Sequence, residues 1–187
     1  MKIMLLLIVM LLALPAQGRE LADVEFADVI AAPVADKQLQ LNGLGIRYKF
    51  VFKIYIAALY LEQPAHEVNA ILSDRGAKRI LMHFLYDEVS KGKLVDAWLE
   101  GFKNNLNADE LKRFDAQIQQ FNSMFETVQR NDVVQIDYLP GQGTRVMIKG
   151  QDKGLIADDG FYPALLKIWL GDDPVSDDLK QALLGNE

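Results

Sequence analysis

The stretch "RYKFVFKIYIAALYL", residues 47–61, decides the fold. Its even positions are all apolar or aromatic, whereas its odd positions begin with Arg47, Lys49 and Lys53 and end apolar. Alternation at period two is typical of a β-strand. We therefore predict one long antiparallel strand, whose even face packs on a core and whose odd face begins in water or in a polar cleft.

The rest of the chain changes between strand-like and helix-like periods. The same reasoning predicts an edge strand within residues 19–36, a short helix at 66–72, strands at 78–86, 133–138, 144–149 and 155–157, helices that begin after Ser90, Asn107 and Ser176, and a helix at 161–170. The helix after Ser90 should bury a stripe made of Leu94, Val95, Trp98, Leu99, Phe102 and Leu106. This order predicts an α+β domain: an antiparallel sheet with helices on one side.

The first eighteen residues differ from the rest. Lys2 precedes an apolar stretch at residues 3–14, and small residues lead up to Gly18. This is the pattern of a secretory signal peptide, and we predict one at residues 1–18, followed by a single domain at 19–187. An uncleaved anchor is the alternative, although the stretch is shorter than the roughly 20 residues that span a bilayer. The short basic start favours a bacterial protein exported to the periplasm.

Composition excludes several classes of function. The net charge of −6 argues against binding to nucleic acid or to an anionic membrane surface. The chain has no cysteine, which excludes thiol catalysis, thiolate metal sites and a lipidated cysteine. His66 and His83 are its only histidines and lack metal-ligand spacing, so we predict no metal and no cofactor. Gly43 and Gly45 lack the third glycine of a dinucleotide fingerprint, and we interpret them as a bend.

Three segments carry a resemblance to a known family: "KFVFKIYIAALYLE" at 49–62, "YDEVSKGKLVDAW" at 86–98 and "FYPALLKIWLGDDPVSDDLKQALLG" at 161–185. Together they resemble the chalcone isomerase-like proteins, and in particular their exported bacterial branch, over about residues 24–185. The resemblance implies an open-faced sandwich, in which a large antiparallel sheet carries a helical layer on one side and a cleft lies between them.

The resemblance also implies a site. The plant enzymes use an arginine that stabilises the phenolate form of the substrate, and its counterpart here is Arg47. A threonine of those enzymes falls on Tyr55, a tyrosine on Tyr86 and an asparagine on Lys93. Because Thr→Tyr fills substrate space and Asn→Lys adds a cation, we do not expect chalcone cyclisation. The non-catalytic branch binds fatty acids, with the arginine and tyrosine on the carboxylate, and this chain keeps both residues.

The sequence thus predicts a non-catalytic protein that binds a fatty acid or a similar small acidic amphiphile through Arg47, Tyr55, Tyr86 and Lys93. One alternative is an isomerase or intramolecular lyase of unknown substrate. Another is a protein of the cell envelope that binds a partner protein and no specific ligand. The basic residues also fit a solvated strand face. On one unbroken strand, Arg47 and Tyr55 would lie about 26 Å apart at about 3.3 Å per residue, too far for one compact ligand.

Overall fold

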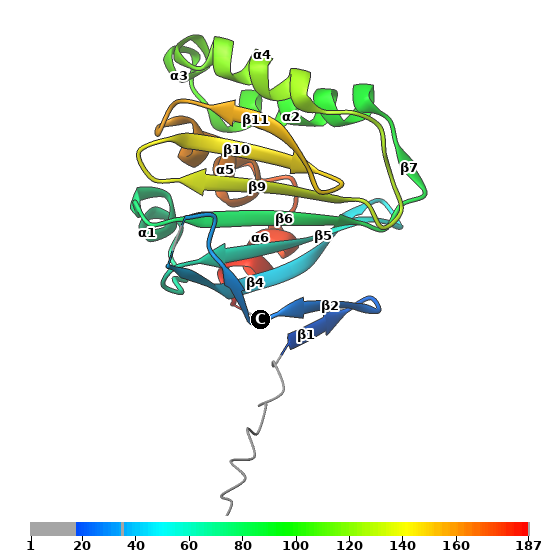
Figure 1. The fold of residues 1–187 in the computed structure, drawn as a ribbon. Helices are drawn as coiled ribbons and strands as arrows, with labels where there is room; N and C mark the ends of the chain where they lie inside the picture. The colour runs from blue at the N-terminus through cyan, green and yellow to red at the C-terminus, as the bar shows by residue number, and fades with distance from the viewer. Residues whose placement is uncertain (1–17, 35, 187) are drawn as a thin grey trace, which may run out of the picture.

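The computed structural model describes residues 18–34 and 36–186. Except for Gly18, the predicted signal peptide lies outside the described residues. The centre of the fold is a seven-stranded antiparallel sheet with the order β11-β10-β9-β6-β5-β4-β3 (Figure 1). Its strands are β3 (Val29–Ala31), β4 (Gln38–Lys49), β5 (Phe52–Leu61), β6 (Lys78–Phe84), β9 (Val133–Leu139), β10 (Gly143–Ile148) and β11 (Gln151–Ile156).

Helices cover one face of this sheet. They are α1 (Val68–Ser73), α2 (Lys91–Asn105), α3 (Ala108–Arg113), α4 (Asp115–Met124), α5 (Phe161–Leu170) and α6 (Asp177–Leu184). The main core lies between them and the sheet, and includes Trp98, Phe121 and Trp169. The prediction of an α+β fold with a helical layer on one side is confirmed. None of the helices within the described residues is long and apolar enough to cross a membrane.

Two small two-stranded sheets complete the fold. β1 (Gly18–Leu21) pairs with β2 (Val24–Ala27), and β7 (Glu88–Val89) pairs with β8 (Val128–Gln129). A second, smaller core includes Phe26 of β2 together with Ile56 and Tyr60 of β5. The large sheet therefore has buried apolar side chains on both of its faces.

The prediction of one long strand at residues 47–61 is wrong. β4 and β5 form a hairpin joined by the two-residue turn Phe50–Val51, in which Phe50 has a φ of 56°. Hairpin turns of two residues usually contain Gly or Asn, whereas this turn is Phe-Val. The sequence therefore gives no sign of the turn. The prediction that the whole even face packs on a core is also wrong, because Tyr48, Phe50 and Phe52 are exposed. Beyond the turn both faces are covered, since Tyr55 lies in the main core and Ile56 in the smaller one.

Three smaller expectations also need correction. Leu99 is 45% exposed, because at 100° per residue it points away from the buried Trp98. The strand expected at 155–157 begins at Gln151. Gly43 and Gly45 do not precede a strand but lie within β4, whose register with β5 shifts between Leu41 and Gly43, and a side chain at either glycine would collide with the backbone or side chains of α6. The glycines allow α6 to pack closely on the sheet.

Candidate functional site

A cavity of about 410 Å³ lies between one end of the β4–β5 hairpin, one face of α2 and the loop before α6. This volume falls within the range of small-molecule pockets. Most of its wall is apolar or aromatic, as is usual for sites that bind organic ligands. The apolar lining includes Phe52, Ile54, Phe84, Leu94, Trp98 and Val175.

All four residues of the predicted site line this one cavity: Arg47, Tyr55, Tyr86 and Lys93. Arg47 lies on β4 and Tyr55 on β5, where the two residues are direct cross-strand partners. Their expected separation of about 26 Å is therefore wrong, because the chain turns back between them. Directly opposed residues in an antiparallel pair have Cα atoms only about 4.5–5.5 Å apart. One compact ligand can reach both side chains.

Tyr55 is buried, and a side chain of α5 fixes the position of its hydroxyl group. The indole N–H of Trp169 on α5 donates a hydrogen bond of 3.1 Å to the Tyr55 hydroxyl oxygen. Burial raises the pKa of Tyr55 to about 12, although the Trp169 hydrogen bond and the positive charge of Arg47 oppose this shift. The hydroxyl group therefore stays protonated at neutral pH. Among the described residues its proton has no acceptor, so it can donate to a ligand.

Arg47 is the only charged lining residue that is partly buried. Lys49, Glu88, Lys93, Glu100 and Asp173 also line the cavity, but each of them is exposed. Within the part of the chain that the structure describes, Arg47 forms no salt bridge and no side-chain hydrogen bond. A partly desolvated cation without a partner is unfavourable. Its planar guanidinium group is suited to two parallel hydrogen bonds with a carboxylate.

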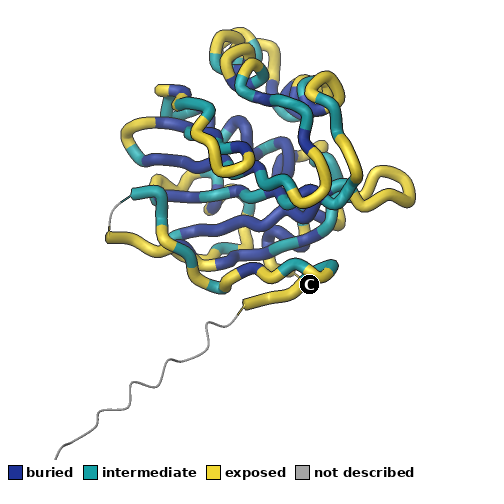
Figure 2. Tube along the Cα trace, turned by 45° about the vertical axis from the view of Figure 1, so that its right-hand side comes forward, coloured by how far each residue is buried: buried dark blue, intermediate teal, exposed yellow. Residues whose placement is uncertain are grey.

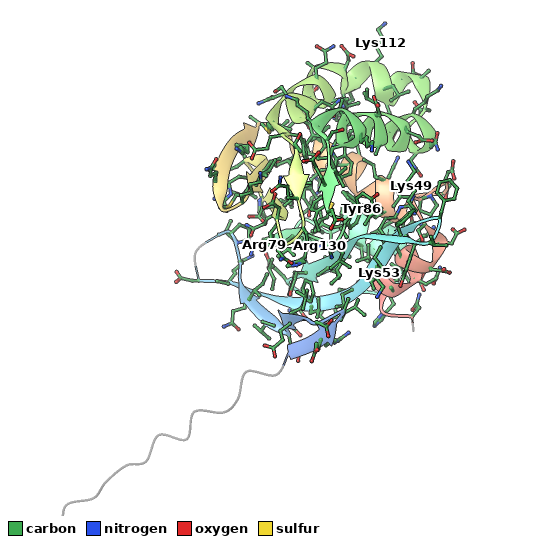
Figure 3. The ribbon with its side chains drawn as sticks, turned by 90° about the vertical axis from the view of Figure 1, so that its right-hand side faces the viewer. Lys49, Lys53, Arg79, Tyr86, Lys112 and Arg130 are labelled. Atoms are coloured by element: carbon green, nitrogen blue, oxygen red, sulfur yellow. The ribbon has the colours of Figure 1, made fainter. Side chains whose placement is uncertain are left out.

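Tyr86 and Lys93 occupy the outer part of the site. The Tyr86 ring meets the Phe52 ring edge to face, with 5.6 Å between the ring centroids. The backbone N–H of Tyr86 donates to the carbonyl oxygen of Ile54, which ties the end of β6 to the hairpin. Lys93 is in the first turn of α2, where its backbone N–H donates to the side chain of Ser90. Tyr86 and Lys49 of the hairpin both line the cavity, and Figure 3 labels both side chains in the view onto this end of the molecule.

Sequence reasoning missed two parts of this site. The first is the role of Trp169, which orients Tyr55 across a separation of 114 residues. The second is the wall formed by Asp173, Pro174 and Val175 in the loop before α6. No local pattern in the sequence indicates either feature, because both depend on how distant segments pack.

Comparisons with known proteins agree with this fold. The sequence matches the chalcone isomerase-like family over residues 18–185. The structure is similar to the crystal structure of a fatty-acid binding protein from Arabidopsis thaliana, with a TM-score of 0.71, 16% sequence identity, and coverage of 91% of this chain and 97% of that chain. A comparison with curated proteins gave no match. Because the family match spans nearly all of the described residues, this chain belongs to the chalcone isomerase-like family.

Proposed function

We propose that this protein binds a fatty acid or a similar small acidic amphiphile, and that it does so without catalysis. The observation that carries the proposal is Arg47, a partly buried cation without an anionic partner among the described residues, which lines a largely apolar cavity. A ligand carboxylate would pair with the Arg47 guanidinium group and accept a hydrogen bond from Tyr55. The acyl chain would lie against the aromatic wall that includes Trp98.

The fold comparison supports a binding role. The similar Arabidopsis thaliana protein is a fatty-acid binding protein, although at 16% identity the likeness concerns the fold and does not transfer its ligand. Lys93 adds a second cation at the rim of the cavity. Because this side chain is exposed, we expect it to contribute less to affinity than Arg47 does.

Isomerisation is less well supported. Intramolecular addition of a phenolate to an enone requires donors placed at the developing enolate. By the family resemblance, Tyr55 takes the place of a threonine in the plant enzymes, and its larger ring would reduce the space for a flat bicyclic substrate. With a pKa of about 12, Tyr55 also cannot act as a base at neutral pH. Turnover of an enone that is lost in Tyr86→Phe would contradict the non-catalytic proposal.

Export is part of the proposal. The basic start, the apolar stretch and the small residues within residues 1–18 support a signal peptide. Intact mass measurement on protein from the periplasm of the producing cell would give the mature N-terminus. A mass equal to that of the full chain would contradict cleavage.

The proposed ligand class can be tested by intrinsic fluorescence. The chain has only two tryptophans, and Trp98 lines the cavity while Trp169 donates to Tyr55, so both lie at the site. We expect palmitate to change this fluorescence and to bind at least about tenfold more tightly than hexadecanol, which lacks the carboxylate. Equal affinities for the acid and the alcohol would show that no carboxylate is recognised.

A further inference from the structure

The turn between β4 and β5 exposes a dense group of apolar side chains. Tyr48 is 44% exposed, Phe50 89%, Val51 83% and Phe52 53%. Elsewhere among the described residues, the exposed large hydrophobic side chains are single and scattered, as is normal for a protein surface. The turn projects from the body of the protein as an exposed loop (Figure 2). We call residues 48–53 the hairpin tip.

The backbone of the hairpin tip does not require these apolar residues. Phe50 has a φ of 56°, a conformation that bulky L-residues rarely adopt and that Gly or Asn adopt more easily. An aromatic residue at this position is therefore unfavourable for two reasons, backbone strain and exposure to water. Folding alone explains neither.

The hairpin tip is also basic. Lys49 and Lys53 are exposed, and neither forms a salt bridge with a described residue. Residues 48–53 contain no acidic side chain, although the whole chain has a net charge of −6. The negative net charge of the whole chain argues against binding to an anionic surface. The positive local charge of the hairpin tip favours such binding.

We propose that the hairpin tip docks on the surface of an anionic phospholipid bilayer. Aromatic side chains are favoured at the interface between lipid and water, and nearby lysines are attracted to anionic headgroups. Phe50 and Val51 would enter the boundary of the acyl chains, while Lys49 and Lys53 would stay among the headgroups. A partner protein would match the apolar residues equally well, but the unpaired lysines favour an anionic lipid.

The hairpin tip is continuous with the cavity, because Lys49, Phe50 and Phe52 also line it. Docking would therefore bring the cavity opening to the bilayer. If the proposed function holds, an amphiphile could pass between the bilayer and the cavity without crossing water. This last step rests on the proposed function, whereas the docking itself does not.

Labelled vesicle-binding experiments can test the docking. Because the chain has no cysteine, Val51→Cys provides a single site for an environment-sensitive fluorophore, and Val51 does not line the cavity. We expect the label to move to an apolar environment on addition of phosphatidylcholine vesicles that contain phosphatidylglycerol. The same label in Leu155→Cys, at an exposed apolar position of β11, should not respond.

A matched pair of charge-reversal variants tests whether docking requires the positive charge of the hairpin tip. Lys53→Glu should weaken binding to the anionic vesicles about tenfold. Lys112→Glu makes the same change of charge on α3, far from the hairpin tip (Figure 3), and should leave binding unchanged. Because all variants share the same N-terminal residues, any binding through that segment cancels in the comparison.

Three outcomes would overturn docking on a bilayer. The first is that Lys53→Glu and Lys112→Glu weaken vesicle binding equally. The second is that the fluorophore at position 51 does not respond to the anionic vesicles. The third is that this fluorophore responds to a higher protein concentration without vesicles, which would identify a second copy of the chain as the partner. The experiment contains no fatty acid, and the palmitate titration contains no vesicles. Failure of docking and failure of the proposed function are therefore distinguishable.

Discussion

Arg47 and Tyr55 form a pair of donors because the hairpin places them opposite each other. A cation and a neutral hydroxyl group are complementary to the two oxygens of a carboxylate, since each oxygen can accept a hydrogen bond. The hydroxyl oxygen of Tyr55 is occupied by Trp169, which leaves its proton for the ligand. The resemblance predicted both residues, but only the structure shows how α5 orients Tyr55.

Glu110 gives a prediction about pH. The salt bridge from Lys167 and the backbone N–H of Asn107 lower the pKa of Glu110 below its usual value. A carboxyl group whose pKa is lower in the folded than in the unfolded state stabilises the folded protein. This stabilisation is fully present above the unfolded-state pKa, which is about 4.3 for Glu, and it is lost as the pH falls through the lower folded-state pKa. Glu110→Gln should therefore reduce the free energy of unfolding at neutral pH, and this difference from the wild type should vanish in acid.

Urea denaturation over a range of pH values measures this effect. Glu88→Gln is a suitable control, because Glu88 is exposed on β7, lies opposite the neutral Gln129 and forms no salt bridge with any described residue. The control should show no comparable pH-dependent difference. A loss of stability in Glu110→Gln that is equally large in acid and at neutral pH would contradict the assignment to charge.

At the scale of elements, the β4–β5 hairpin shows where sequence patterns stop being informative. Alternation predicted strand structure correctly over most of residues 47–61, but it also ran through the turn without a break. A two-residue turn made of Phe50 and Val51 offers no Gly, Asn or Pro to mark it. Helix starts were easier to predict, because Ser90, Asn107 and Ser176 are local caps and the structure confirms all three.

The packing of α6 on β4 gives a second prediction. A Cβ atom added at Gly43 would collide with the carbonyl oxygens of Ala182 and Leu183. Gly43→Ala should therefore lower the free energy of unfolding by about 1–3 kcal/mol, as expected for overpacking. Gly92→Ala is the matched control, because nothing lies within 4 Å of the added atom and α2 should gain up to about 1 kcal/mol from the better helix former.

Denaturant titration of both variants decides this point. The account predicts a lower midpoint for Gly43→Ala and an equal or higher midpoint for Gly92→Ala. If both alanines were tolerated equally, close packing of α6 would not be the reason for a glycine in β4.

At the scale of the whole molecule, the features on which the two proposals rest gather at one end. The cavity, the hairpin tip and the first turn of α2 are adjacent there, whereas the far ends of β5 and β6 are buried in the cores. The sequence predicted the fold class, because strand and helix periods and caps are local signals. Those local signals could not predict the cavity, whose walls come from β4, β5, β6, α2 and the loop before α6. Only the family resemblance implied a cleft between the sheet and the helices.

The central claim is that Arg47 binds the acidic group of an amphiphile. The most direct measurement is the affinity for palmitate of Arg47→Met, followed by tryptophan fluorescence, with Arg130→Met as the matched control. Arg130 is exposed, pairs with Asp87 and does not line the cavity. The account predicts that Arg47→Met binds palmitate at least about tenfold more weakly while Arg130→Met binds it as the wild type does. Unchanged palmitate affinity in Arg47→Met would contradict the account.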